Sequence, residues 1–104
     1  MADVALLYST FADREDAERV ARIVLDERLA ACVNILAPCT SIYRWQGEVA
    51  QGEEVPALFK TRAALERRLR ERIAELHRYD LPVIESWPVA ASDAVGAWID
   101  SETL

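Results

Sequence analysis

LAACVNILAPCTSIYRWQG, residues 29–47, is the most informative stretch of this chain. It starts as an almost unbroken apolar run, which is typical of a strand buried on both faces of a sheet. It ends in an aromatic and cationic cluster, Tyr43, Arg44 and Trp45, just before Gly47 and a turn. Because large aromatic side chains are costly to leave in water, we expect another subunit or a ligand to cover this cluster.

A strand and a helix precede this stretch. Residues 4–11, VALLYSTF, are rich in strand formers and predict a buried first strand. Asp13 then has the position of a helix N-cap, and the acidic Glu15 and Asp16 follow in the first turn, where the helix dipole favours negative charge. The apolar stripe that begins there predicts an amphipathic helix of about four turns that ends near Leu29.

The chain beyond this stretch predicts a hairpin. Pro38 should bend the central strand, because proline cannot donate a hydrogen bond to a sheet ladder. Gly47 and Gly52 bracket a short polar segment and favour a hairpin into a third strand over residues 55–61. Pro56, near the start of that strand, indicates a sheet edge or a bulge.

A second helix, a fourth strand and a short last helix complete the pattern. Thr61 is the predicted cap of the second helix, and His77 closes that helix because Pro82 prevents it from resuming. Residues 83–89 predict a short strand, and Ser92 caps the final helix. The second helix carries a narrow apolar seam within a mixed-charge face, as solvated helices do: Leu65, Leu69, Ile73 and Leu76.

The predicted order is β-α-β-β-α-β with an additional C-terminal helix. This is the α+β, ferredoxin-like pattern, in which four antiparallel strands carry two helices on one face. No repeat or shift in composition divides the chain, so residues 1–104 form one predicted domain. The inner strands look apolar on both faces, so we expect a partner to bury the second face; the residues concerned are Ala31, Val33, Ile35, Ala57 and Phe59.

Composition disfavours several classes of protein. Hydrophobic residues make up 52% of the 104, which suffices for one packed core. The net charge of −6 disfavours nucleic-acid binding, because backbone phosphates carry the same sign. No run reaches the roughly 18 consecutive apolar residues of a membrane span, and no basic-then-apolar signal segment opens the chain. We therefore expect a cytoplasmic protein with no nucleic-acid or membrane partner.

Motifs for catalysis are sparse. The chain has one histidine and lacks a Gly-x-Ser-x-Gly motif, a glycine-rich phosphate loop and a His-Glu-x-x-His motif. Cys32 and Cys39 do not have the spacing of a zinc site and are interpreted as buried, reduced thiols. A soft-metal site and a nucleophilic cysteine are the alternatives. We expect a protein that is not an enzyme.

Three residues stand out for binding rather than for catalysis. Lys60 is the only lysine, at the end of an apolar strand, and it suits an anion ligand or an intersubunit ion pair equally well. His77 has the position of a capping residue at a helix C-terminus, where the helix dipole favours its protonated form. Trp45 favours an interface anchor over a substrate platform.

Four motifs, in this order, extend over nearly the whole chain. They are residues 29–35 (LAACVNI), residues 40–47 (TSIYRWQG), residues 60–62 (KTR) and His77-x-Tyr79-x-x-Pro82. On these residues the sequence resembles the CutA family, the divalent-cation tolerance proteins. The resemblance implies a tight homotrimer that is related in architecture to the PII signalling proteins and has clefts between its subunits.

The resemblance also implies which residues form the cleft. Arg44, Trp45, Lys60 and Tyr79 are the expected cleft residues, and Tyr43 and Trp45 are expected at the subunit interface. A small anionic ligand would suit the cationic side chains of Lys60 and Arg44.

Some members of the family are described as binding copper or other divalent ions. His77 and Glu85 are the candidate metal ligands in this chain, and copper is the metal that the resemblance implies. The chain has Ser9 where some copper-binding members carry cysteine, and Leu76 where some have the first of two histidines. One imidazole together with buried thiols is a poor set of copper ligands.

The leading prediction is a non-enzymatic homotrimer of the divalent-cation (copper) tolerance type that binds a metal ion or a small ligand in intersubunit clefts. A PII-like signalling protein and a structural adaptor trimer with no metal role are the alternatives. An enzyme with Cys32 or Cys39 as nucleophile ranks lower. An RNA-recognition variant of the same fold ranks last, because the central strands lack its exposed aromatic pair and the net charge has the wrong sign.

Overall fold

The computed structural model describes residues 2–104, which contain five strands and three α-helices. The strands are β1 (Ala2–Phe11), β2 (Cys32–Ile35), β3 (Cys39–Trp45), β4 (Glu48–Arg62) and β5 (Ile84–Ala91). The helices are α1 (Arg14–Asp26), α2 (Glu66–Leu76) and α3 (Asp93–Glu102), and a 3-10 turn, Ala63–Leu65, precedes α2. None of these helices is long and apolar enough to cross a membrane.

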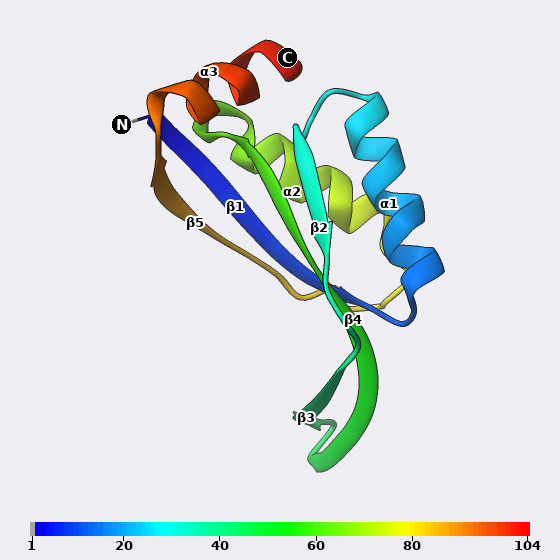
Figure 1. Ribbon diagram of the computed structural model, residues 1–104. Coiled ribbons are helices and arrows are strands. Elements are labelled where there is room, and N and C mark those ends of the chain that lie inside the picture. The colour runs from blue at the N-terminus through cyan, green and yellow to red at the C-terminus, as the bar shows by residue number, and fades with distance from the viewer. Residues whose placement is uncertain (1) are drawn as a thin grey trace.

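The strands form an antiparallel sheet in the order β2-β4-β1-β5, and β3 pairs with the remaining length of β4. The helices α1 and α2 cover one face of this sheet, and α3 lies across the end where β1 begins and β4 ends (Figure 1). This arrangement confirms the predicted α+β, ferredoxin-like class with an additional C-terminal helix.

The hydrophobic core lies between the sheet and the two helices. Leu7 of β1 and Phe59 of β4 are cross-strand neighbours, and both are fully buried. The apolar stripes of the helices complete the core with Val20, Val24, Leu69 and Ile73. The period of these stripes, one apolar residue every three or four positions, places them all on the sheet side.

The ends of α1 follow from local chemistry. The Asp13 carboxylate accepts the backbone N–H of Asp16 at 2.8 Å, which confirms the predicted N-cap. The helix stops at Asp26, before the predicted end near Leu29. It stops there because Arg28 has a left-handed φ of 60°, and the Leu29 N–H returns to the Val24 carbonyl oxygen at 2.9 Å.

The stretch 29–47 is not one bent strand, as predicted, but two strands, β2 and β3, with Pro38 in the gap between them. The hairpin that follows turns at Gln46 and Gly47, whose φ values are 51° and 83°. Positive φ at both central residues is the signature of a type I′ turn, one of the two favoured two-residue hairpin turns. Gly52 lies inside β4 and does not end the turn.

The prediction for the start of the third strand was also wrong, because β4 begins at Glu48 rather than near residue 55. Pro56 lies on a strand inside the sheet, opposite Thr10 of β1, and not at an edge. It occupies the point where β4 changes neighbours, since the pairing with β2 ends at Ala57 and the pairing with β3 begins at Glu54. A missing N–H costs little at such a change of partner.

Thr61 does not cap the second helix, which is another correction to the prediction. It lies within β4, its side chain is fully buried, and its hydroxyl has no hydrogen-bond partner within residues 2–104. The chain enters α2 through the 3-10 turn, and Leu65 takes the N-cap position without a side-chain hydrogen bond.

The two faces of the sheet also differ from the prediction. Val33 and Ile35 lie on an edge strand, beside Phe59 and Ala57, and pack against the helix-covered core. These apolar residues therefore share one face, because side chains alternate along a strand. The opposite face is mixed, as one row across all four strands shows: Cys32, Lys60, Leu6 and Trp87.

Candidate functional site

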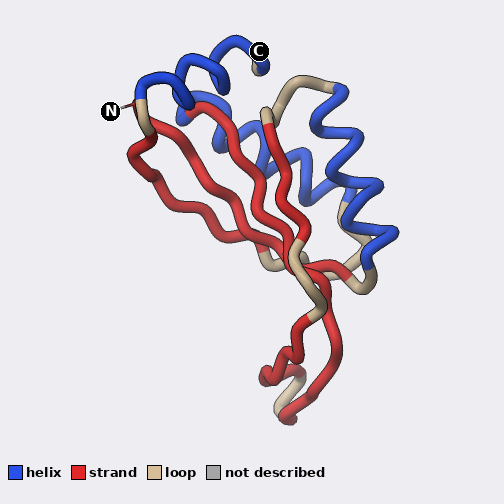
Figure 2. Tube along the Cα trace, in the orientation of Figure 1, coloured by secondary structure: helices blue, strands red, loops and turns tan. Residues whose placement is uncertain are grey.

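A two-stranded arm projects from the rest of the molecule (Figures 1 and 2). It consists of β3 and residues 48–54 of β4, with Trp45 opposite Glu48 near the tip and Cys39 opposite Glu54 at the base. We call the remainder of the described chain the body. The arm accounts for the elongated shape, 45 Å along one axis against 24 and 23 Å along the others.

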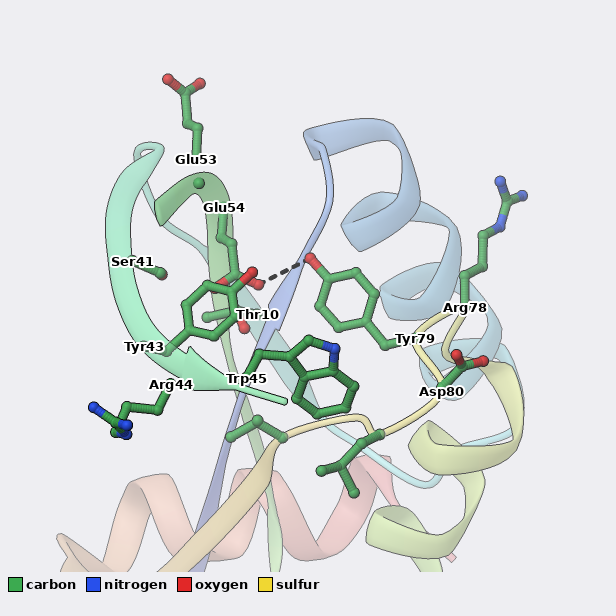
Figure 3. A pocket seen from close by; sticks show the side chains of 13 residues that line it. Thr10, Ser41, Tyr43, Arg44, Trp45, Glu53, Glu54, Arg78, Tyr79 and Asp80 are labelled. Atoms are coloured by element: carbon green, nitrogen blue, oxygen red, sulfur yellow. Dashed lines mark hydrogen bonds between the residues drawn. The ribbon is translucent and has the colours of Figure 1, made fainter. Parts of the chain in front are cut away.

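A pocket of about 750 Å³ lies where the arm meets the body. Its walls are the arm, Thr10 near the end of β1, and the loop of residues 78–83 between α2 and β5 (Figure 3). The volume lies within the range of sites for small molecules, roughly 300–1,000 Å³. Segments that are distant in sequence therefore build a single candidate site.

Three aromatic rings and one carboxylate form the inner part of this pocket. Tyr43 and Trp45 come from the same face of β3, and Tyr79 comes from the loop (Figure 3). The three rings lie around Glu54, and the Tyr79 hydroxyl donates to its Oε2 at 2.8 Å. Tyr43 and Trp45 stay 47% and 46% exposed, so this chain alone covers the aromatic cluster only in part.

The protonation states of Glu54 and Tyr79 support each other. Burial raises the pKa of Glu54, but hydrogen bonding from Ser41, Tyr79 and Thr10, together with the nearby His77, outweighs it and leaves the pKa below its ordinary value. Burial, and next the hydrogen bond to Glu54, raise the pKa of Tyr79 well above its ordinary value. At neutral pH the pair is therefore a carboxylate and a phenol, and one fixed negative charge lies among the rings.

His77 lies behind Tyr79 and does not line the pocket. The ring is buried and stacks on Phe11, with 4.6 Å between the ring centroids. Its Nδ1 accepts the Tyr79 backbone N–H at 3.2 Å, so its Nε2 carries the hydrogen and donates to the Thr10 carbonyl oxygen at 2.8 Å. His77 is thus the C-cap of α2, as predicted, and both of its ring nitrogens are hydrogen-bonded.

An ion-pair cluster holds the loop of residues 78–83 against α1. Asp16, which is buried, lies 3.2 Å from Arg78 Nε and 3.0 Å from an Arg19 terminal nitrogen. The other contact of Arg19 is a hydrogen bond of 2.6 Å to the Leu76 carbonyl oxygen. The start of α1 therefore positions the segment that carries Tyr79.

The structure brings only some of the sequence-predicted residues together. Arg44, Trp45 and Tyr79 line the pocket, although the Arg44 guanidinium points away from its interior (Figure 3). Lys60 lies six residues beyond Glu54 on β4, roughly 20 Å along the strand, and pairs with Cys32 and Leu6. Lys60 is therefore not part of the pocket.

Glu85 lies on β5, opposite Tyr8 of β1, and is exposed. Burial raises the pKa of Tyr8, and the nearby acidic groups, Glu54 and Glu85 among them, raise it further. Glu85 is therefore close enough to the base of the arm to contribute to its negative potential. It does not line the pocket.

Sequence reasoning missed Glu54, the central acid of the pocket. The only feature of the sequence that could have identified Glu54 was its position. It is a charged residue directly before the buried run of residues 55–57, at the boundary between the exposed and the buried part of the strand. Ser41 and Thr10 were missed for a different reason. Their hydroxyls matter only because β1 and β3 converge on Glu54, which is a tertiary effect.

A divalent metal ion does not fit the residues of a single chain. Within residues 2–104, no group of three or more histidine, cysteine, aspartate or glutamate side chains is arranged to hold a metal ion. A metal ion at His77 would have to displace one of the two hydrogen bonds of its ring. Oε2 of Glu54 already accepts a hydrogen bond from the Tyr79 hydroxyl at 2.8 Å.

The fold and the site together define a ferredoxin-like domain with a projecting arm over an aromatic pocket. The family described as CutA1 divalent ion tolerance protein matches residues 5–102. The chain belongs to this family, as the sequence motifs predicted.

Individual relatives agree with this assignment. The chain is 44% identical over 90 residues to a divalent-cation tolerance protein CutA of Thermus thermophilus, covering 86% of this chain and 85% of the relative. It is 47% identical over 79 residues to the Pyrococcus horikoshii protein of the same name, covering 76% of each. The crystal structure of CutA1 from Ehrlichia chaffeensis superposes with a TM-score of 0.92 at 34% identity, covering 100% of this chain and 98% of that one.

Proposed function

We propose that this chain is a non-enzymatic, cytoplasmic protein of divalent-cation tolerance that acts as a homotrimer. In this proposal each subunit interface contains the arm, and a small ligand or a metal ion binds in the cleft below it. The names of the relatives support the tolerance role, since they are called divalent-cation tolerance proteins.

The observation that carries the proposal is that the arm has exposed apolar side chains on both faces. Tyr43 and Trp45 lie on the pocket side, and Ile42 and Val49, 68% and 65% exposed, lie on the other side. A two-stranded ribbon with this much exposed apolar surface is unstable alone in water. Packing against other copies of the chain would cover both faces, and a closed trimer would leave no arm unpaired.

Metal binding requires more than one chain can supply. His77 and Glu85 are the candidate ligands, with copper as the metal that the family implies. A single chain does not supply a complete ligand set, so any bound ion would need ligands from neighbouring subunits.

Light scattering combined with a chelator-competed titration of copper and zinc tests both parts. We expect a mass of three subunits. Because the chain has one histidine, the imidazole NMR signals report on His77 alone. Binding of about one ion per subunit, with these signals shifted and with Glu85→Gln weakening it, would support a shared metal site. A trimer that binds neither ion would restrict the cleft to small ligands, and a monomer would overturn the proposal.

A structural adaptor or PII-like signalling trimer with no metal role is the second candidate. It is favoured by the engagement of both His77 nitrogens and by the distance of Lys60 from the pocket. In an adaptor, Lys60→Ala would leave all measurable binding unchanged, whereas an anion site that used Lys60 would lose its ligand. Calorimetry with inorganic phosphate on wild type and Lys60→Ala separates the two.

A further inference from the structure

We propose that the pocket below the arm binds a small organic ammonium ion, held by the faces of Tyr43, Trp45 and Tyr79 and by the carboxylate of Glu54. This inference rests on the proposed function in one respect, namely that the cleft below the arm is a ligand site. It adds the chemical class of the ligand, which differs from both the metal ion and the anion that the sequence suggested.

The first step in the argument is the composition of the inner wall. Tyr43 and Trp45 from one face of β3, and Tyr79 from the loop of residues 78–83, line the same space beside Glu54 (Figure 3). The faces of aromatic rings carry negative electrostatic potential, and a cation over such a face is attracted most strongly when water is excluded. Several rings around one acid are therefore complementary to a cation of low hydration.

The second step is the sign of the charge inside the pocket. Glu54 is an anion, since its pKa is lowered by the hydrogen bonds that it accepts. The two arginines at the rim do not neutralise it. The Arg44 guanidinium points away from the rings, and Arg78 extends outward and pairs with Asp16 at 3.2 Å (Figure 3). His77 does not line the pocket, so Glu54 is the charged group that lies among the three rings.

The third step distinguishes an organic cation from a metal ion. Divalent metal ions need several oxygen, nitrogen or sulfur ligands around one point, and within residues 2–104 no three histidine, cysteine, aspartate or glutamate side chains are grouped to hold one. An alkylammonium ion needs only nearby π-faces and a negative charge, without direct coordination. The volume of about 750 Å³ leaves room for a substituted ammonium, and the neighbouring apolar residues Leu81 and Val83 suit its alkyl groups.

Choline and 3,3-dimethylbutan-1-ol are the matched probes, because they share size and shape but differ in charge. Calorimetry on the intact protein should detect choline, and the neutral alcohol should bind at least about tenfold more weakly, as expected for a cation in a desolvated aromatic site. Equal affinity for the two would overturn the proposal by identifying a merely apolar pocket. No binding of choline by a protein that is trimeric on light scattering would overturn it as well, and would leave the proposed assembly intact.

Two pairs of variants locate the site. Glu54→Gln should lower choline affinity about tenfold, whereas Glu53→Gln, which removes the same charge from a side chain that points away, should not (Figure 3). Tyr43→Leu should weaken binding and Tyr43→Phe should preserve it, because only the former removes the ring. If Glu54→Gln fails to fold, Tyr43→Leu and Tyr43→Phe still test whether choline binds in this pocket. If Glu53→Gln weakened binding as much as Glu54→Gln, or if Tyr43→Leu had no effect, the assignment would be wrong.

Discussion

The two halves of β4 show how one strand can serve two purposes. From Val55 onward the strand pairs with β1, and from Ala57 to Lys60 it pairs with β2 as well. Val55, Ala57 and Phe59 are buried. Before Val55 it pairs only with β3 in the arm, and Val49 is 65% exposed. The same backbone conformation continues through both halves. The difference between a core strand and a surface ribbon therefore comes from what packs against it.

The comparison also separates stability from binding. The body half contributes the core that holds the fold together, whereas the arm half contributes Glu54 to the pocket and apolar residues to a surface. Substitutions in the body should therefore change the free energy of unfolding, and substitutions in the arm should change assembly and binding.

Phe59→Ala should have the largest effect. Phe59 is fully buried against Phe11, so its truncation removes core contacts and leaves a cavity, and we expect a loss of about 3–5 kcal/mol in the free energy of unfolding. Urea denaturation followed by circular dichroism measures it. The matched change in the arm, Val49→Ala, should cost the isolated subunit less than about 0.5 kcal/mol. Similar losses for both would erase the distinction between the two halves.

Trp45→Ala should act on assembly. An aromatic anchor at the centre of an interface contributes roughly 2 kcal/mol or more to association, so the proposed trimer should dissociate at protein concentrations where wild type stays intact. Light scattering across a dilution series measures this, and the isolated subunit should keep its circular dichroism spectrum. A variant that remains trimeric on dilution to the same degree as wild type would show that Trp45 is not an anchor.

Thr61→Val should change little, although Thr61 is as buried as Phe59. Its hydroxyl has no hydrogen-bond partner in the described part of the chain, so replacing it by a methyl group of similar size removes a desolvated polar atom. We expect an unfolding free energy equal to that of wild type or higher by up to about 1 kcal/mol. Thr61→Ser, which keeps the hydroxyl and loses the methyl group, is the control and should be less stable. A clear loss in Thr61→Val would indicate that the hydroxyl has a hydrogen-bond partner in solution.

The ion pair between α1 and α2 should have the smallest effect, and only at low pH. Glu27 accepts two hydrogen bonds of 2.8 Å from Arg72, which, with burial opposing, lower its pKa below the ordinary 4.5. Because the folded-state pKa is the lower one, the contribution to stability is present above pH 4.5 and is lost as the pH falls through the folded value. Urea denaturation at a series of pH values measures this. Glu27→Gln should make the free energy of unfolding less dependent on pH below 4.5. Glu75→Gln should not, because the Glu75 carboxylate lies 3.9 Å from Arg72.

Sequence patterns predicted most of the body. The capping aspartate Asp13, the apolar period of α1 and α2 and the order of the strands are local properties, so they can be read along the chain. The errors lie where local signals compete. Thr61 is a good capping residue by type but remains in a strand, and Pro56 suggests an edge but lies where β4 changes partners.

The pocket was harder to predict. Tyr43, Trp45 and Tyr79 were identified as site residues by type and by family resemblance, and they meet in the structure. The sequence did not indicate that Glu54 lies among them, nor that Lys60 lies elsewhere. Both facts depend on the pairing of β3 with β4 and on the path of the loop after α2.

The sequence by itself determined the class of fold, the family and the aromatic residues of the site, because periodicity, caps and short motifs need only neighbours along the chain. Tertiary structure alone decided which side chains share the pocket, and with which charges. It brings Thr10, Ser41 and Tyr79 to one carboxylate, and it turns Arg78 toward Asp16. The physical reason is that hydrogen bonding, burial and charge depend on distances in space, which residues far apart in sequence acquire only when the sheet, the arm and the loop come together.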